Sequence, residues 1–361
     1  MTALKAILGC VLVVLVLQDA FETVILPRRP RHGFRITRYF YRSTWAPWKA
    51  IARGMNNRRR RETFLSLFGP LSLLLLLALW ALGLVLGFAV LQWADGSRVS
   101  GSLRGTFGAD LYFSGSTFFT LGLGDVTPQT NLARFLTVLE AGTGFGFLAL
   151  VISYLPVQYQ SFSRREISIS LLDARAGTPP TGVELVRRHE GNMQEFTRLL
   201  LEWEQWSAEL LETHMSYPVL AYFRSQHDNQ SWLASLVAVL DACALCMIGL
   251  RDGPERQARL TFAIARHALV DLAQVFDTPP SHELVRLPDE AMPQLCNAIR
   301  NAGLELLGDS HPERLAKLRN MYEPYAGALA QFLLTDLPPW IKPQAGADNW
   351  ETSRWGRNTV V

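Results

Sequence analysis

One uncharged, strongly apolar stretch limits what this chain can fold into more than any other feature. No Asp, Glu, Lys or Arg occurs from Thr63 to Ala94, and residues 73–77 are all leucine. A helix of roughly 20 apolar residues crosses the hydrocarbon core of a bilayer, which is about 30 Å thick. The stretch is long enough to cross a membrane, so the sequence excludes a soluble protein.

Two further apolar segments and the basic residues define the expected topology. The segments run from Ala6 to Leu26 and from Phe135 to Ser163, and the pair Arg164–Arg165 follows the second of them. Between Arg28 and Arg61 there are 12 basic residues and no acidic one. Short loops with this bias stay in the cytoplasm. We expect three spans in the inner (plasma) membrane, with the N-terminus outside and everything after the third span inside.

The first apolar segment could instead be a cleaved signal peptide. Cleavage needs small residues just after the apolar run, and Gln18-Asp19-Ala20-Phe21 is poor for that. A lipidation box at Ile7–Cys10 is disfavoured because the apolar run follows the cysteine. We interpret the segment as a retained span, in which Asp19 and Glu22 share a face and pair with arginines of the basic loop.

The net charge changes sign after Arg165. Residues 1–165 hold 18 basic and 7 acidic side chains, whereas residues 166–361 hold 17 and 25. Four cysteines are too few for a disulfide-stapled secreted domain of this length, so a reducing cytoplasm suits most of the soluble part. The two parts of the chain are expected to meet different surroundings.

A glycine-containing motif lies between the second and third apolar segments. Residues 110–120 are apolar, aromatic and hydroxylic, and as a helix they would span about half a membrane. The sequence Thr120-Leu121-Gly122-Leu123-Gly124-Asp125 follows. Alternating glycines allow positive φ angles that point successive carbonyls the same way. A ring of such carbonyls from several chains can replace the hydration shell of a cation.

At this point the sequence resembles a known family. Thr117-x-x-Thr120-Leu121-Gly122-Leu123-Gly124-Asp125 resembles the filter signature of potassium channels. The order of outer span, pore helix, filter and inner span resembles the two-span pore module of that superfamily, over roughly residues 65–165. Here the module is of bacterial type with an extra N-terminal span. The signal is specific because motif, membrane context and helix order agree.

The resemblance implies a role for each filter residue. The carbonyls that would bind potassium, together with the Thr120 hydroxyl, are those of Thr120, Leu121, Gly122 and Leu123. Gly124 would complete the curve of the backbone, and Asp125 would cap the outer mouth. One such segment cannot surround an ion, so a homotetramer is implied.

Two filter positions depart from the commonest pattern of the family. Leu121 stands where valine is usual, and Leu123 stands where tyrosine or phenylalanine is usual. The backbone ligands survive, but the hydrogen bond of an aromatic hydroxyl behind the filter is lost. A non-selective cation channel is therefore an alternative, and so is a membrane-anchored signalling or scaffold protein with a vestigial pore loop.

Ionisable and hydroxyl side chains near the filter are candidates for its support, because ionisable groups inside a membrane are functional by default. Ser116 and Thr117 belong to the pore helix, and Glu140 to the inner span. Ser116 occupies the position where some relatives place a glutamate that shares a proton with the filter aspartate. Glu140 is expected to share a proton with Asp125 or simply to position the pore helix.

Three alternating glycines lie near the middle of the inner span, at Gly142, Gly144 and Gly146. Glycine weakens a helix interior by up to about 1 kcal/mol, so these residues are candidates for a gating hinge. Close packing against neighbouring helices is an equal alternative.

The basic loop interleaves aromatic residues with arginines and ends in a run of four, namely Arg58, Arg59, Arg60 and Arg61. Beside a membrane, this composition indicates an interfacial segment that lies on anionic lipid. A merely solvated loop is the alternative, and nucleic-acid binding is not expected so close to two spans.

The remainder of the chain has the pattern of amphipathic helices and almost no strand signal. Leu199, Trp203, Trp206 and Leu210 recur on one helix face. Cys243 and Cys246 have metal spacing but sit in an apolar run, and His267 with Asp271 lacks a third ligand. We predict a regulatory or assembly module that responds to an unknown cytoplasmic ligand or protein. No enzyme and no cofactor are expected, only potassium as the permeant ion.

The sequence thus predicts a mainly α fold, with a membrane helical channel module of three spans and a re-entrant pore helix, followed by an all-α cytoplasmic domain. The expected parts are a first span (1–27), a basic loop (28–62), a pore module (63–160), a linker (161–180), a helical domain (181–342) and a polar tail (343–361).

Overall fold

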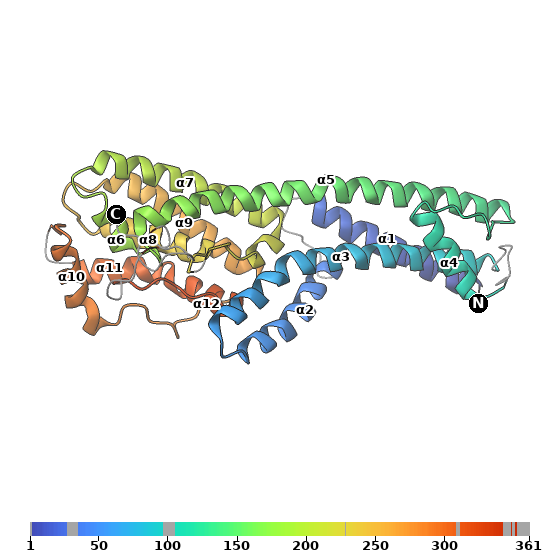
Figure 1. Ribbon diagram of the computed structural model, residues 1–361, viewed down its shortest axis with the longest axis horizontal. Helices are drawn as coiled ribbons and strands as arrows, with labels where there is room; N and C mark the ends of the chain where they lie inside the picture. Colours follow the sequence, from blue (N-terminus) through green and yellow to red (C-terminus); the bar gives the residue numbers. More distant parts are fainter. Residues whose placement is uncertain are drawn as a thin grey trace. The chain divides into compact units, whose positions relative to one another are not determined.

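The computed structural model describes residues 2–26, 35–96, 105–227, 229–307, 311–341, 348 and 351. Within these ranges the chain is mainly helical and contains no strand, and an isolated bridge joins Leu250 to Leu306. The predicted mainly α fold is confirmed. The chain divides into two compact units, Met1–Gln160 and Ser161–Val361, each of which is described by itself (Figure 1).

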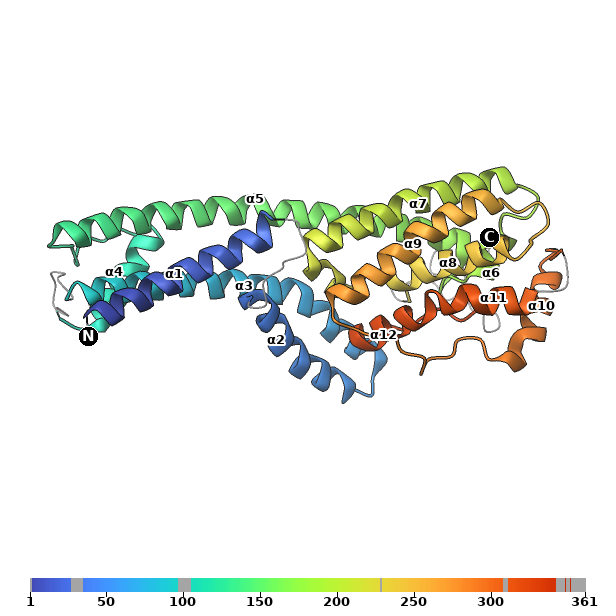
Figure 2. The same ribbon diagram turned by 180° about the vertical axis from the view of Figure 1, so that it is seen from behind.

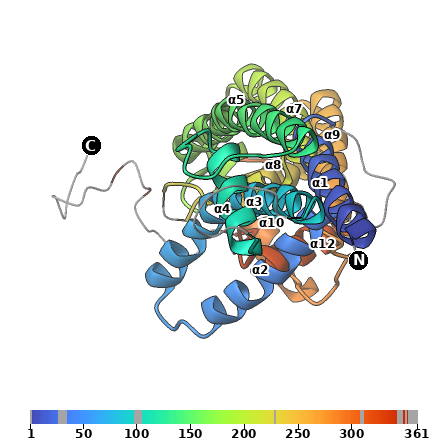
Figure 3. The same cartoon turned by 90° about the vertical axis from the view of Figure 1, so that its right-hand side faces the viewer.

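The first unit consists of α1 (Thr2–Val24), α2 (Ile36–Arg53), α3 (Arg58–Ala94), α4 (Phe107–Phe118) and the first part of α5 (Asn131–Ala176). Helices α1, α3 and α5 contain the three predicted spans, and each is long and apolar enough to cross a membrane. Helix α4 lies between α3 and α5 (Figure 3), where the re-entrant pore helix is expected.

Glycines bring α1 close to α3, and the two helices lie side by side (Figure 2). A Cβ at Gly87 of α3 would lie 2.6 Å from Val13 of α1, and one at Gly83 would lie 2.9 Å from Val16. Packing of this kind is the main attraction between helices in lipid, because lipid tails are as apolar as the side chains. The first apolar segment is therefore built into the fold of this unit.

Polar groups join α1 to both of its neighbours. The Asp19 carboxylate accepts hydrogen bonds from Nε1 of Trp80 at 2.9 Å and from Oγ1 of Thr37 at 2.6 Å. Glu22 pairs with Arg35 at 3.7 Å. The expected pairing with basic-loop arginines is thus seen for Glu22, whereas the described partners of Asp19 are a tryptophan and a threonine.

The predicted basic loop contains helix α2 and the first turn of α3. Trp45 is buried against Phe68, and Trp48 stacks on Phe64 with 4.3 Å between ring centroids. The backbone of the arginine run is held by Asn57, whose side chain accepts a hydrogen bond from N of Arg60 at 3.1 Å. The side chains of Arg58, Arg59 and Arg60 are exposed, and that of Arg61 is half-buried.

The second unit begins with the last turns of α5, so residues 161–176 of the expected linker are helical. The helices that follow are α6 (Gly182–Arg187), α7 (Met193–Ser216), η1 (Pro218–Tyr222), α8 (Trp232–Met247), α9 (Glu255–Val275), η2 (Asp289–Ala291), α10 (Met292–Asn301), α11 (His311–Asn320) and α12 (Glu323–Leu333).

Helix α8 is the centre of the second unit, since every residue from Trp232 to Cys246 is buried. The predicted apolar face of α7 is buried as well, with Leu199, Trp203, Trp206 and Leu210. Cys243 and Cys246 pack in the core, and no group of three possible metal ligands occurs among the described residues.

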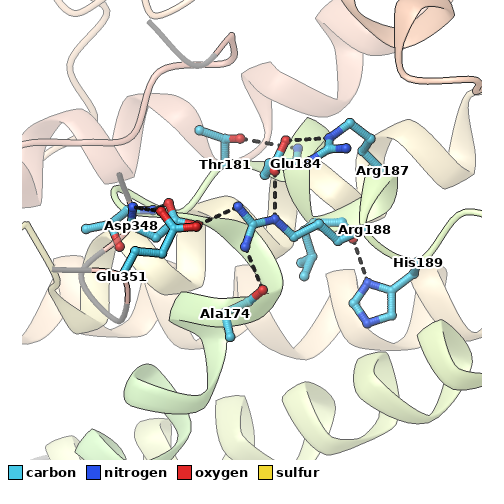
Figure 4. Close-up of polar contacts among 10 residues, drawn as sticks. Ala174, Thr181, Glu184, Arg187, Arg188, His189, Asp348 and Glu351 are labelled. Carbon is cyan, nitrogen blue, oxygen red and sulfur yellow. Dashed lines mark hydrogen bonds and ion pairs between the residues drawn. The ribbon is translucent and has the colours of Figure 1, made fainter. Parts of the chain in front are cut away.

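Figure 4 shows how the end of α5 is fastened within the second unit. Glu184 accepts hydrogen bonds from Arg187 and Arg188, which lower the pKa of its carboxyl to about 2. Arg188 also donates to the carbonyl of Ala174 at 2.6 Å and to Asp348 at 2.6 Å. Asp348 belongs to the predicted polar tail, most of which lies outside the described residues.

Candidate functional site

The predicted filter segment is continuous with the end of helix α4. Oγ1 of Thr106 caps the start of this helix by accepting a hydrogen bond from N of Ala109 at 3.2 Å. At the other end, N of Thr120 donates to the Thr117 carbonyl at 3.0 Å, and N of Leu121 donates to the Ser116 carbonyl at 2.8 Å. Ser116 and Thr117 therefore hold the first filter residues through their backbone.

The backbone of the segment alternates between two conformations. Thr120, Gly122 and Gly124 have φ angles of +56°, +58° and +78°, whereas Leu121 and Leu123 do not have positive φ. Such alternation turns successive peptide units so that their N–H groups share one side and their carbonyls the other. The glycine spacing predicts two of these positions.

Thr120 is the position of positive φ that the glycine spacing does not predict. A non-glycine residue in this region costs about 1–3 kcal/mol and persists where its surroundings enforce it. The hydrogen bonds between α4 and residues 120–121 supply that enforcement.

Within one chain, the segment from Thr120 to Asp125 is exposed throughout. The side chains of Leu121 and Leu123 are each 62% exposed. Within a single chain the segment therefore does not enclose a site.

Tyr112 of α4 provides a support that the sequence analysis missed. Its hydroxyl donates a hydrogen bond to Oδ2 of Asp125 at 3.0 Å. Because Leu123 has no hydroxyl, the hydroxyl of Tyr112 is the aromatic one that holds the outer end of the segment. The sequence places a tyrosine in the expected pore helix, but it does not show which way that side chain points.

Glu140 of α5 meets α4 at a different point from the one expected. It hydrogen-bonds through Oε1 to Oγ of Ser114, and Oγ of Ser114 also lies 2.7 Å from the Val85 carbonyl of α3. Glu140 and Asp125, proposed to share a proton, thus have separate described partners. Of the two expected roles of Glu140, the contacts correspond to positioning of the pore helix.

The three glycines of α5 have different surroundings. A Cβ on Gly144 would collide with the carbonyl oxygen of Phe118 at the end of α4. A Cβ on Gly142 or Gly146 would meet no other atom within 4 Å. Close packing therefore accounts for Gly144, whereas a hinge at Gly142 and Gly146 stays a prediction.

Much of α5 within the first unit is uncovered. The large apolar side chains exposed along its length include Phe135, Val138, Leu139, Phe145, Leu148 and Ile152. Val138 alone is 73% exposed. In an aqueous protein such a face marks an interface, and in a membrane it faces lipid or another helix.

Arg165 attaches the continuation of α5 to α7 and η1 of the second unit. Its guanidinium donates to the carbonyls of Leu220 at 2.8 Å and Phe223 at 2.7 Å, and lies 3.1 Å from Nε2 of His214. Nδ1 of His214 lies 2.9 Å from the Leu210 carbonyl, so Nδ1 carries the proton and Nε2 accepts from Arg165. Burial, and then the charge of Arg165, hold the pKa of His214 well below its usual value.

Comparisons with known proteins agree with this architecture. Residues 74–160 match the model of a family described as "Ion channel". This range takes in most of the apolar part of α3, all of α4, the filter segment and the first part of α5. Part of the first unit is therefore similar to an ion-channel family, and three helices of the chain are long and apolar enough to cross a membrane.

A curated relative was found in Bacillus subtilis (strain 168), the "Uncharacterized membrane protein YdjJ". It is 27% identical over 189 residues, which make up 49% of this chain and 52% of the relative. The chain thus spans about half the length of the curated relative it matches. No solved structure matches the chain.

Proposed function

We propose that four copies of this chain form a channel that passes potassium ions down their gradient. The observation that carries the proposal is the alternation of φ at Thr120, Gly122 and Gly124, which lines up successive carbonyls. Carbonyl oxygens arranged in this way can replace the water shell of a dehydrated cation, and repulsion between ions at adjacent sites offsets the binding.

In this proposal potassium is bound by the backbone oxygens of residues 120–123 and the hydroxyl of Thr120. Gly124 lets the chain turn away from the axis, and Asp125 lies at the outer mouth. The family match to residues 74–160 supports ion conduction by this part of the chain.

Two observations support assembly from several copies. The filter segment is exposed in one chain, and α5 leaves a long apolar face uncovered. Rotation about a common axis would close the ring of carbonyls and cover part of this face. One filter segment per chain makes four copies the natural number.

The proposal extends to the surroundings of the pore. The N-terminus lies outside the plasma (inner) membrane, whereas α2, Arg58–Arg61 and the second unit lie on the cytoplasmic side, with the arginines against anionic lipid. An unknown cytoplasmic ligand or protein would gate the pore by preferring one arrangement of the second unit. Arg165 would pass the change to α5.

A specific observation favours a second candidate, a non-selective cation channel. Leu123 cannot supply the hydroxyl that supports many potassium filters, and the support from Tyr112 reaches Asp125 rather than the carbonyl row. We propose that potassium is still preferred over sodium, but less sharply than in filters with tyrosine at this position.

Ion flux in liposomes tests the proposal directly. Purified full-length protein should carry potassium current, and reversal potentials with potassium on one side and sodium on the other should report a preference for potassium. Equal permeabilities would leave a non-selective cation channel. Absence of flux from folded protein at every pH, voltage and lipid composition tried would favour the scaffold alternative.

A further inference from the structure

We infer that Glu140 is held in its neutral, protonated form and positions the ion-binding segment by donating a hydrogen bond to Ser114. The protonation follows from the geometry behind α4 alone. The positioning role rests on the proposed channel function, because it concerns the segment that would bind the ion.

The first argument is burial without a balancing charge. Glu140 and Ser114 are both 0% exposed. Among the described residues, Oε2 of Glu140 has no hydrogen-bond partner and no ion pair includes this carboxyl. An ionised carboxylate buried without a cation is strongly unfavourable, whereas a neutral carboxyl tolerates one unpaired oxygen far better.

The second argument is a count of protons. Oγ of Ser114 is in hydrogen-bonding contact with two oxygens, the Val85 carbonyl and Oε1 of Glu140. A hydroxyl has one proton, and a carbonyl can only accept. Both hydrogen bonds can exist at once only if Ser114 donates to Val85 and Glu140 brings a proton of its own.

This proton completes a chain of donors from α5 through α4 to α3. An ionised Glu140 would compete with the Val85 carbonyl for the single proton of Ser114, and one of the two links would be lost. Ser114 lies two residues before Ser116, whose carbonyl holds N of Leu121. A shift of α4 would therefore be passed directly to the first filter residues.

Few other charged groups face this position. Asp110 of α4 lies one turn before Ser114, and Arg134 of α5 lies six residues before Glu140. The part of α3 around Val85 contributes none, because no residue from Thr63 to Ala94 is charged. A pH effect at this site should consequently come from Glu140, with Asp110 as the group to check.

Infrared spectroscopy tests the protonation without requiring ion flux. Full-length protein in lipid at neutral pH should show the C=O stretch of a buried carboxylic acid that is absent from the Glu140→Gln variant. Glu62→Gln serves as the matched control and should leave this band in place. A spectrum in which Glu140→Gln removes only a carboxylate band would overturn the inference.

Potassium and sodium permeability in liposomes tests the positioning role. Glutamine is neutral and can still donate to Ser114, so Glu140→Gln should retain the wild-type preference for potassium. Glu140→Ala and Ser114→Ala should lose about tenfold of that preference, because each removes a buried hydrogen bond.

Wild-type flux should fall as the pH rises and Glu140 ionises. The flux of the Glu140→Gln variant should respond less to pH, and Asp110→Asn should keep the wild-type response.

The outcomes separate the inference from the proposed function. A glutamine variant that behaves like the alanine variant would show that the negative charge is needed, which contradicts a neutral Glu140. If no liposome shows ion flux while the carboxylic acid band is present, the proposed function and the positioning role fail together, whereas the protonation of Glu140 stands. The infrared measurement also covers the case in which an alanine variant does not fold.

Discussion

The two units of this protein differ in the side chains that they expose. In the first unit Leu4, Val138 and Phe145 are largely exposed, while Glu140 and Ser114 are fully buried. In the second unit every residue of α8 from Trp232 to Cys246 is buried, and the exposed surface is largely polar. The first unit therefore exposes the apolar surface that suits lipid and other helices, and the second unit exposes a surface that water can solvate.

The largest effect is expected where the first unit depends on close backbone contact. Replacing Gly144 by leucine should abolish ion flux, because the new side chain would collide with the Phe118 carbonyl and displace the end of α4. Gly115→Ala is the control and should retain flux, since a Cβ there would approach Val85 only to 3.9 Å. Equal flux from both variants would contradict the packing role of Gly144.

In the second unit, a large effect is expected from the loss of a buried ion pair. Arg286 pairs with Asp241 of α8 at 2.5 Å, and both side chains are almost fully buried. Replacing Arg286 by methionine should cost about 3–5 kcal/mol of stability, because the buried carboxylates of Asp241 and Glu323 both lose this cation. Thermal unfolding should show this loss, and the double variant with Asp241→Asn should recover part of it.

The same ion pair tests whether the two units have separate roles. If the two units have separate duties, Arg286→Met protein that stays folded at low temperature should keep the ion preference of the wild type. A changed ratio of potassium to sodium permeability would show that the second unit shapes the filter as well as the gate.

A smaller effect is expected from His214, whose pKa is held well below its usual value in the folded protein. The unfolded chain takes up a proton below about pH 6.5, but the folded chain does not, so stability is lost as the pH falls through this range. Between pH 6.5 and 5.5 the wild type should lose about 1 kcal/mol more than His214→Gln. Unfolding measured at the two pH values checks this, and identical losses would contradict the prediction.

The smallest effect is expected at the outer end of the filter segment. Tyr112→Phe removes the hydroxyl that donates to Asp125, and one hydrogen bond contributes about 0.5–1.5 kcal/mol. Reversal potentials should then show a potassium preference reduced by a few-fold. Leu123→Tyr should change the preference in the opposite direction, and a Leu123→Tyr variant that matches the wild type would undercut the role assigned to hydroxyl support.

Sequence patterns were sufficient wherever a property depends on residues that are close along the chain. The three spans, the helix before the filter, the positive φ of Gly122 and Gly124 and the buried face of α7 all belong to this group. Hydrophobicity, helical periodicity and the conformational freedom of glycine act over a few residues, so the amino-acid order alone determines them.

Tertiary structure decided which side chains meet. Tyr112 and Asp125 are 13 residues apart, and Ser114 and Glu140 are 26 apart. Asp19 and Trp80 are 61 apart. No local pattern specifies these pairs, because each depends on how far a helix is rotated and shifted against its neighbours. The close approach of Gly144 to Phe118 likewise exists only once α4 and α5 are packed, and the same packing buries Glu140 away from water.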